Sequence, residues 1–271
     1  MWVSMKEMIE LSRPRVSAIG SILAVNLEQV QGILEAGVEL RRPVIVALSE
    51  PAAIYSGLAP FIAMTRELAE QVPVPVSVEL DHVCGMDFIS HAIETGYSGI
   101  LADSREEDGA RKLERLAAIK ELCNQSGTFF EVEIGGRGPA RMDADFAGRV
   151  LAELQPDSAC ITIPEAERKS PSQNLYEVTE SIISSTSVPV SMAGAGSWSK
   201  EDIKRFINLG VWKISIGTRT NQAFKRGLKY YLDNFPDRVQ PRSYLGHARE
   251  EFRKEVRECL STLVSFEGEH D

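Results

Sequence analysis

Two adjacent side chains, Asp81 and His82, form the sharpest chemical feature of this 271-residue sequence. A carboxylate beside an imidazole supplies a proton acceptor and a candidate metal ligand in one place. The pair also has a structural interpretation, in which the aspartate caps the N-terminus of a helix and the histidine is incidental. The dipeptide alone leaves both interpretations open, so its position in the fold has to decide between them.

A second acidic feature is the pair Glu131 and Glu133, which lie two residues apart in the run FFEVEI. In a strand such residues face the same way, and two buried carboxylates are costly without a cation or hydrogen bonds. They indicate a polar pocket, with Glu133 as a candidate catalytic residue. The alternative is an ion-pair network with Arg137 or Lys213. For Lys213 the sequence favours a structural ion pair over a Schiff base with a carbonyl substrate.

Two glycine-containing segments, Gly194-Ala195-Gly196-Ser197 and Gly217-Thr218-Arg219, each precede a candidate helix. Both could present backbone N–H groups to an anion such as a phosphate. The alternative is that glycine only permits a tight turn from strand to helix.

Short β-branched runs that alternate with amphipathic stretches must position these residues. The alternation predicts repeated βα units around a parallel sheet, and eight parallel strands close a barrel. The predicted strands are Val16–Ile22, Pro43–Leu48, Pro75–Leu80, Gly99–Ala102, Phe129–Ile134, Ala159–Ile163, Pro189–Met192 and Trp212–Ile216. We therefore predict an α/β fold, a (β/α)8 TIM barrel with an additional C-terminal helix, formed as a single domain over residues 1–271.

The active site of such a barrel lies at the C-terminal ends of its strands, so the residues after each run become candidates. They include Ser49 and Glu50 after the second run, Asp81 and His82 after the third, Asp103 after the fourth, Glu167 after the sixth, and the two glycine segments after the last two. Phosphate sites commonly form from the last two loops. We assign substrate or phosphate binding to Ser49, Gly194, Ala195, Gly196, Ser197, Gly217, Thr218 and Arg219.

Helix marks support this organisation. Asn26 is a predicted N-cap for a first helix whose apolar face carries Leu27, Val30, Ile33 and Leu34. The C-terminal helix has a similar stripe, formed by Leu245, Ala248, Phe252, Val256, Cys259 and Leu263, and should pack on the barrel or on a second subunit. The final residues, EGEHD, are expected to be disordered.

Bulk composition narrows the class of protein. The net charge of -9 argues against nucleic acid or an anionic membrane as a partner, since both bind proteins through clustered Lys and Arg side chains. The four cysteines lie far apart without a CxxC pair, which is typical of free thiols in a reducing compartment. No stretch of about 18 consecutive apolar residues occurs. We expect a soluble, cytoplasmic protein.

Several segments, taken in order, resemble the class II fructose- and tagatose-bisphosphate aldolases. They are VSMKEM, NLEQVQGILEAG, LDH, EVEIG, GAGS and PRSYLGHAREEFRKEV, and the resemblance covers residues 3 to 262. It implies zinc-dependent aldol cleavage of a small phosphorylated carbonyl substrate, with Asp81 moving the proton and His82 as the first zinc histidine. It also implies a homodimer or homotetramer.

The positions at which this sequence differs from the family pattern are those that carry the family's chemistry. Glu167 stands near the position of the second zinc histidine, and Ala193 stands at the third. A catalytic zinc normally has three protein ligands, and His82 alone cannot hold one. This sequence also has different residues from the family at five positions of the expected pocket: Leu23, Val83, Ser215, Gly217 and Arg219. Arg219 replaces an aspartate, and its guanidinium suits phosphate binding.

Two functions from different classes remain. The first is an aldolase-like carbon–carbon lyase, or a related enolising enzyme, that acts on a phosphorylated sugar or oxo-acid with Asp81 as acid and base. It could use a divalent metal held by His82, Glu167 and a glutamate of the fifth strand, or work without metal through Arg219, Lys169 or His82. The second is a non-catalytic homologue that binds a ligand or stabilises a partner subunit. A Schiff-base enzyme using Lys213 or Lys169 is a third alternative.

Overall fold

The computed structural model describes residues 1–12, 17–103, 109–135 and 144–263. Within these residues, eight parallel strands form a closed barrel in chain order. The strands are β1 (Ile19–Leu23), β2 (Val44–Ser49), β3 (Val76–Val83), β4 (Gly99–Ala102), β5 (Phe129–Glu133), β6 (Ser158–Thr162), β7 (Val190–Ala193) and β8 (Lys213–Ile216). This confirms the predicted barrel.

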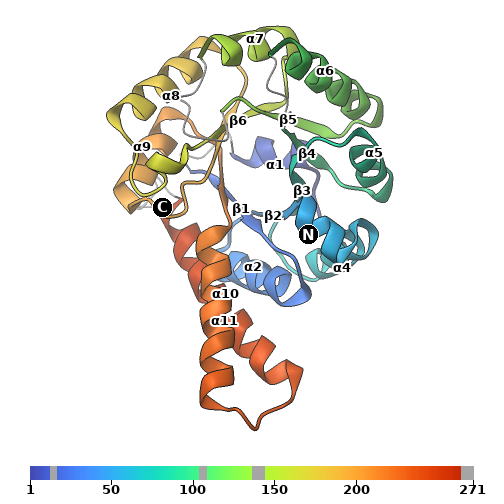
Figure 1. Ribbon diagram of the computed structural model, residues 1–271, viewed down its shortest axis with the longest axis vertical. Helices are drawn as coiled ribbons and strands as arrows, with labels where there is room; N and C mark the ends of the chain where they lie inside the picture. Colours follow the sequence, from blue (N-terminus) through green and yellow to red (C-terminus); the bar gives the residue numbers. More distant parts are fainter. Residues whose placement is uncertain (13–16, 104–108, 136–143, 264–271) are drawn as a thin grey trace.

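Helices surround the strands (Figure 1). The described helices are α1 (Met5–Ser12), α2 (Leu27–Leu40), α3 (Glu50–Ser56), α4 (Leu58–Glu70), α5 (Met86–Thr95), α6 (Gly109–Ser126), α7 (Ala144–Leu154), α8 (Gln173–Ser185), α9 (Lys200–Leu209), α10 (Thr218–Asn234) and α11 (Pro241–Thr262), with the short 3-10 helix η1 (Glu165–Glu167). Two helices rather than one follow β2. Gly57, with φ of 78°, separates them in a conformation that favours glycine.

The predicted strand bounds lie within three residues of the observed ones. The largest difference that bears on the site is in β3, which continues through Val83, so Asp81 and His82 lie inside the strand rather than after it. The pairing of β3 with β4 shifts register between Leu80 and Val83. This irregularity lets the end of β3 turn its side chains in a way that a regular strand does not.

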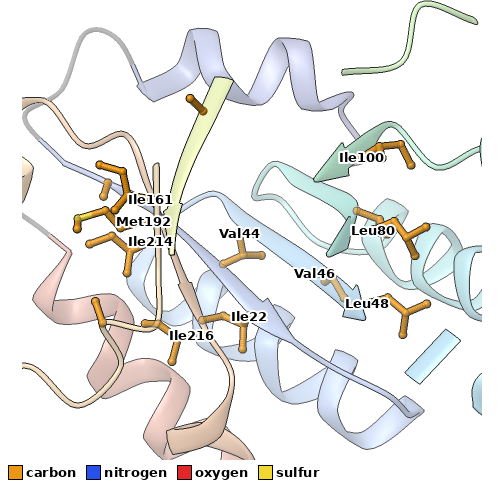
Figure 2. Close-up of a cluster of buried hydrophobic side chains, with 14 of the residues drawn as sticks. Ile22, Val44, Val46, Leu48, Leu80, Ile100, Ile161, Met192, Ile214 and Ile216 are labelled. Carbon is orange, nitrogen blue, oxygen red and sulfur yellow. The ribbon is translucent and has the colours of Figure 1, made fainter. Parts of the chain in front are cut away.

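The strands bury two different faces. Apolar side chains such as Val46, Leu80 and Ile214 (Figure 2) belong to the same cluster as the helix residues Ile33 and Phe61. A separate cluster consists of Leu101, Cys160 and Ala193. Buried polar groups come from the alternating strand positions: Ser21, Glu79, Glu131, Ser191 and Lys213. The centre of the barrel is therefore largely polar.

Helix α1 closes the N-terminal end of the barrel. Met5 and Met8 pack with Ile19, Phe129 and Trp212 in one buried cluster. With that end closed by apolar side chains, the opposite end is left for the site.

The first and last helices of the prediction are α2 and α11. Asn26 caps α2 as expected, since its side chain accepts a hydrogen bond from the Gln29 backbone N–H at 3.0 Å. On the predicted apolar face, Val30 and Ile33 are buried, whereas Leu27, the first residue of α2, is 41% exposed.

Helix α11 packs on the barrel through α2. The ring of Phe252 is so close to Gly32 that a Cβ there would lie 3.0 Å away. In Figure 1, α10 and α11 together extend beyond the barrel as a hairpin. The final EGEHD segment, predicted to be disordered, lies outside the described residues, as does Arg137.

All four cysteines are free, as predicted. Of the described helices, none is long and apolar enough to span a membrane.

Candidate active site

The C-terminal ends of β3, β6, β7 and β8 surround a cavity of about 390 Å³. Eight predicted site residues line it: Asp81, His82, Gly194, Gly196, Ser197, Gly217, Thr218 and Arg219. The rest of the wall consists of Leu23, Thr162, Ile163, Glu165, Arg168, Ala193, Ser215 and Ile216. Four other predicted residues, Ser49, Glu133, Glu167 and Ala195, lie elsewhere.

Asp81 and His82 are joined by a hydrogen bond of 2.9 Å between His82 Nδ1 and Asp81 Oδ1. Both residues are buried, at 7% and 8% exposure. An ionised carboxylate only accepts hydrogen bonds, so Nδ1 carries the proton. Asp81 does not cap a helix, because the N-cap of α5 is Gly85. The capping alternative is therefore wrong, and the carboxylate faces the cavity with the imidazole bound to it.

The other ring nitrogen of His82, Nε2, faces Thr162 and Glu133. It lies 3.2 Å from Thr162 Oγ1 and 3.8 Å from Glu133 Oε1. Thr162 has one hydroxyl proton, which it can donate either to the lone pair of Nε2 or to Glu133. In the second case Nε2 bonds to the Thr162 oxygen only when it carries a proton itself. Side chains of this chain thus lie against both nitrogens of the ring.

Glu133 lies behind His82 rather than in the cavity wall. It is 1% exposed, and burial raises its pKa to about 7. The nearby charge of His82 works against this rise, whereas the charge of Asp103 adds to it. Glu133 can therefore hold a proton near neutral pH. It reaches the cavity only through His82.

The other glutamate of β5, Glu131, belongs to a buried ion-pair network deeper in the barrel. Lys213 Nζ donates to both carboxylate oxygens of Glu79 at 2.6 Å and also to Glu131. Burial raises the pKa of Glu79. Burial also acts to raise the pKa of Glu131, but the charge of Lys213 together with hydrogen bonds to Glu79, Lys213 and Ser191 lowers it. The same two carboxylates outweigh burial at Lys213 and raise its pKa. The predicted structural ion pair of Lys213 is confirmed, and its amine is held protonated below the cavity.

The two glycine segments form adjoining parts of the wall. Gly194 has φ of 101°, a conformation that side chains other than glycine rarely adopt. Ala195 is buried behind the wall, where its carbonyl accepts a hydrogen bond from Trp198 N at 3.0 Å. Ser49, at the end of β2, is the residue before α3 and pairs in register with Asp81.

Arg219 lines the cavity and is also anchored by the C-terminal helix. Its Nη2 donates to Glu258 Oε1 at 2.7 Å, and its Nε donates to Glu255. A guanidinium carries more donors than these two bonds use. The structure therefore connects the cavity directly to α11.

In the loop after β6, the Glu167 side chain bonds within the loop and the Arg168 side chain lines the cavity. Glu167 Oε2 accepts a hydrogen bond from Ser172 N at 2.8 Å, at the start of α8. Its carbonyl accepts one from Trp198 Nε1 at 2.8 Å, which ties this loop to the loop after β7. Arg168, the next residue, lines the cavity.

Four polar cavity residues were left unassigned from the sequence or only noted as departures: Thr162, Glu165, Arg168 and Ser215. Ser215 is 8% exposed, and its hydroxyl has no hydrogen-bond partner among the described residues. Thr162 and Ser215 occupy the last inward positions of β6 and β8, so strand alternation carried a usable signal for them. No such signal exists for Arg168, because it lies in an irregular loop.

In the described part of the chain, no three His, Cys, Asp or Glu side chains converge to hold a metal ion. Ala193, at the position of a histidine in the resembling family, contributes no donor atom to the cavity wall. A tetrahedral metal site with three protein ligands is not formed by these residues.

Comparison with known proteins places the chain among relatives of one kind. The family profile described as "Fructose-bisphosphate aldolase class-II" matches residues 3–268. A Bacillus subtilis (strain 168) protein named "Probable fructose-bisphosphate aldolase" is 29% identical over 269 residues, 94% of each chain.

Two solved structures are similar in fold. The YdjI aldolase from Escherichia coli K12 superposes with a TM-score of 0.85 at 24% identity over 100% of both chains. The fructose-bisphosphate aldolase from Campylobacter jejuni has a TM-score of 0.79 at 18% identity, over 97% of this chain and 95% of the other. At these identities the likeness shows the barrel fold and not the reaction.

Proposed function

The chain belongs to the class-II fructose-bisphosphate aldolase family of carbon–carbon lyases, and we propose that it enolises a phosphorylated sugar or oxo-acid with Asp81 as acid and base. The observation that carries the proposal is the position of Asp81. Its carboxylate lines a cavity of about 390 Å³ and is held there by His82. A base held in a shaped cavity, beside anion-binding loops, is what proton abstraction next to a carbonyl requires.

The proposed step is a proton transfer. Asp81 takes a proton from the carbon next to the substrate carbonyl, and the C–H electron pair becomes the C=C bond of an enediolate. The carbonyl π electrons move to oxygen, which becomes negative. In the cleavage direction Asp81 takes the proton of the hydroxyl beside the C–C bond, that hydroxyl becomes a carbonyl, and the C–C electron pair becomes the enediolate. Protonated Asp81 then returns the same proton to the enediolate carbon. Nδ1–H of His82 stabilises the ionised form of Asp81 between these events.

Phosphate recognition is proposed for the two glycine segments. Gly194, Gly196 and Ser197 adjoin Gly217 and Thr218 in the same wall. Thr218 begins α10, so its backbone N–H and those after it are at the positive end of a helix. The side chain of Arg219 adds a positive charge beside them. This arrangement supports a phosphorylated substrate over a neutral sugar.

The family typically uses a divalent metal, but the residues of this chain do not fit one. The cavity wall holds one imidazole, whose two nitrogens bond to Asp81 and Thr162. Glu167 bonds to Ser172 instead. Carboxylates of Asp81 and Glu165 also line the cavity, but among the described residues no three His, Cys, Asp or Glu side chains converge to hold an ion. No step above depends on a metal.

The experiment that tests the proposal follows the exchange of carbon-bound protons of dihydroxyacetone phosphate with D2O by NMR. Wild-type protein should catalyse exchange, and Asp81→Asn should lower the rate at least about 100-fold with an unchanged melting temperature. Equal rates in both proteins would remove Asp81 from its role. Absence of exchange and of aldol cleavage across a panel of phosphorylated ketoses and oxo-acids would favour the non-catalytic homologue.

A further inference from the structure

We propose that this site works without a bound metal ion and that Arg168 supplies the positive charge facing the oxygen atoms of the enediolate. The inference rests on the proposed function and names the group that stabilises its intermediate. It is carried by three features of the cavity: the engagement of His82, the position of Arg168, and the unpartnered hydroxyl of Ser215.

His82 has one nitrogen that a metal could use, and Thr162 lies against it. Its Nδ1 proton is directed to Asp81 at 2.9 Å, and its Nε2 is 3.2 Å from Thr162 Oγ1. A metal at Nε2 would displace the Thr162 hydroxyl from that lone pair. Among the described residues, no two further His, Cys, Asp or Glu side chains converge with His82 to hold such an ion.

Arg168 is brought to the cavity by the loop after β6. If Gly194 carried a Cβ, this atom would lie 3.8 Å from Arg168 Nε, so the guanidinium lies against the floor of the glycine loop. The loop is held there by the bond from Trp198 Nε1 to the Glu167 carbonyl, and the buried Trp198 ring stacks on Phe206 at 4.9 Å.

The charge of Arg168 is available to a ligand. Among the described residues, no carboxylate forms an ion pair with it, in contrast to Arg219. A guanidinium presents donors in a planar fork that matches the two oxygens of an enediolate or a carboxylate. Arg168 is exposed at the surface as well as lining the cavity. A cation beside developing negative charge stabilises it, and it also disfavours the entry of a divalent cation.

Ser215 completes the ligand-facing set. Its hydroxyl, on the last inward position of β8, is buried, lines the cavity and has no partner among the described residues. A buried hydroxyl without a partner is costly unless a ligand bonds to it. The geometry therefore points to a substrate oxygen between Arg168 and Ser215.

The first test measures metal binding independently of activity. Protein purified without a tag is analysed by mass spectrometry, then dialysed against zinc, manganese and cobalt separately. We expect well below one ion per chain in every case. About one tightly bound ion per chain, lost in His82→Asn, would overturn the proposal.

The second test measures dihydroxyacetone phosphate exchange in a chelator. Wild-type exchange should persist, Arg168→Gln should reduce it about 100-fold, and Arg168→Lys should retain part of the rate. Arg238→Gln, an exposed arginine between α10 and α11, is the matched control and should behave as wild type. Unchanged exchange in Arg168→Gln, or loss of wild-type exchange that zinc restores, would overturn the proposal.

Binding of 2-phosphoglycolate separates this inference from the proposed function. This probe has a planar carboxylate in place of the enediolate and needs no turnover. In the chelator, calorimetry should show about tenfold weaker binding to Arg168→Gln than to wild type. If wild-type protein catalyses no exchange, the proposed function fails. The metal content and the two affinities for 2-phosphoglycolate still test whether Arg168 binds the ligand in a metal-free site. Equal affinities of wild type and Arg168→Gln would overturn the role of Arg168.

Discussion

The imidazole of His82 lies against the carboxylate of Asp81, its own neighbour in the chain, with 2.9 Å between Nδ1 and Oδ1. Consecutive residues of a regular strand point to opposite faces of the sheet. Here φ of His82 is 54°, in the left-handed region, and the ring turns back over the preceding residue. The pairing of base and imidazole thus depends on an uncommon backbone conformation.

This conformation predicts how His82 tolerates substitution. Asn adopts a positive φ with little cost, whereas a β-branched residue does not. His82→Val should therefore be less stable than His82→Asn by about 1 to 3 kcal/mol, measured by urea unfolding. Both variants should lose activity. Equal unfolding free energies for the two would show that the backbone relaxes at this position.

Arg219 and Arg226 provide a matched pair for testing the phosphate site. Both bond to Glu255, but only Arg219 lines the cavity. Arg219→Ala should weaken the binding of inorganic phosphate about tenfold in calorimetry, and Arg226→Ala should leave it unchanged. If both variants bind phosphate as wild type does, the anion site does not include Arg219.

Lys213 should be essential for stability. Replacing it with methionine leaves Glu79 and Glu131 buried without their cation, so the unfolding free energy should fall by about 3 to 5 kcal/mol. Lys229 is the control, because it forms an exposed pair with Asp233 at the same 2.6 Å distance. Lys229→Met should have little effect, since exposed ion pairs contribute little. Comparable losses in denaturant unfolding would contradict the role of burial.

Glu133 predicts a pH dependence of stability. Its pKa rises from 4.5 to about 7 on folding, so between these values the unfolded chain loses this proton while the folded chain keeps it. Stability should fall as pH rises through this window, by on the order of 3 kcal/mol. Glu133→Gln cannot lose a proton there. Relative to wild type, the variant should gain stability from pH 5 to pH 8 in urea unfolding, and a constant difference would contradict the shift.

The hairpin of α10 and α11 predicts self-association. Tyr230, Leu232, Phe235 and Val239 are large apolar side chains exposed on it. In Figure 1 the hairpin extends beyond the barrel, away from the other described elements. We propose that a second copy covers these side chains in a homodimer or homotetramer. Val239→Asp should lower the mass measured by light scattering. Tyr55→Asp, at an exposed residue of α3, should not, and equal masses for wild type and Val239→Asp would contradict the proposal.

The sequence by itself determined the barrel and the end of it that carries the site. Eight β-branched runs were enough to locate every strand, because strand formation and burial depend on local patterns of side chains. The order of these runs then placed Asp81 and the two glycine segments at strand ends, where barrels concentrate their chemistry. Glu167 and Ala193, at two histidine positions of the family, likewise predicted an altered metal site.

Only the tertiary structure decided which of these residues act together. Glu131 and Glu133 look equivalent in FFEVEI, yet one meets Lys213, 82 positions away, and the other lies behind His82. The two glutamates lie at different depths along the barrel axis. Which side chains each one meets at its depth depends on how the sheet closes into a barrel, and local sequence does not set this. Likewise, no periodic pattern directs the Glu167 carboxylate to Ser172 and the Arg168 side chain to the cavity, because an irregular loop is oriented by its tertiary contacts.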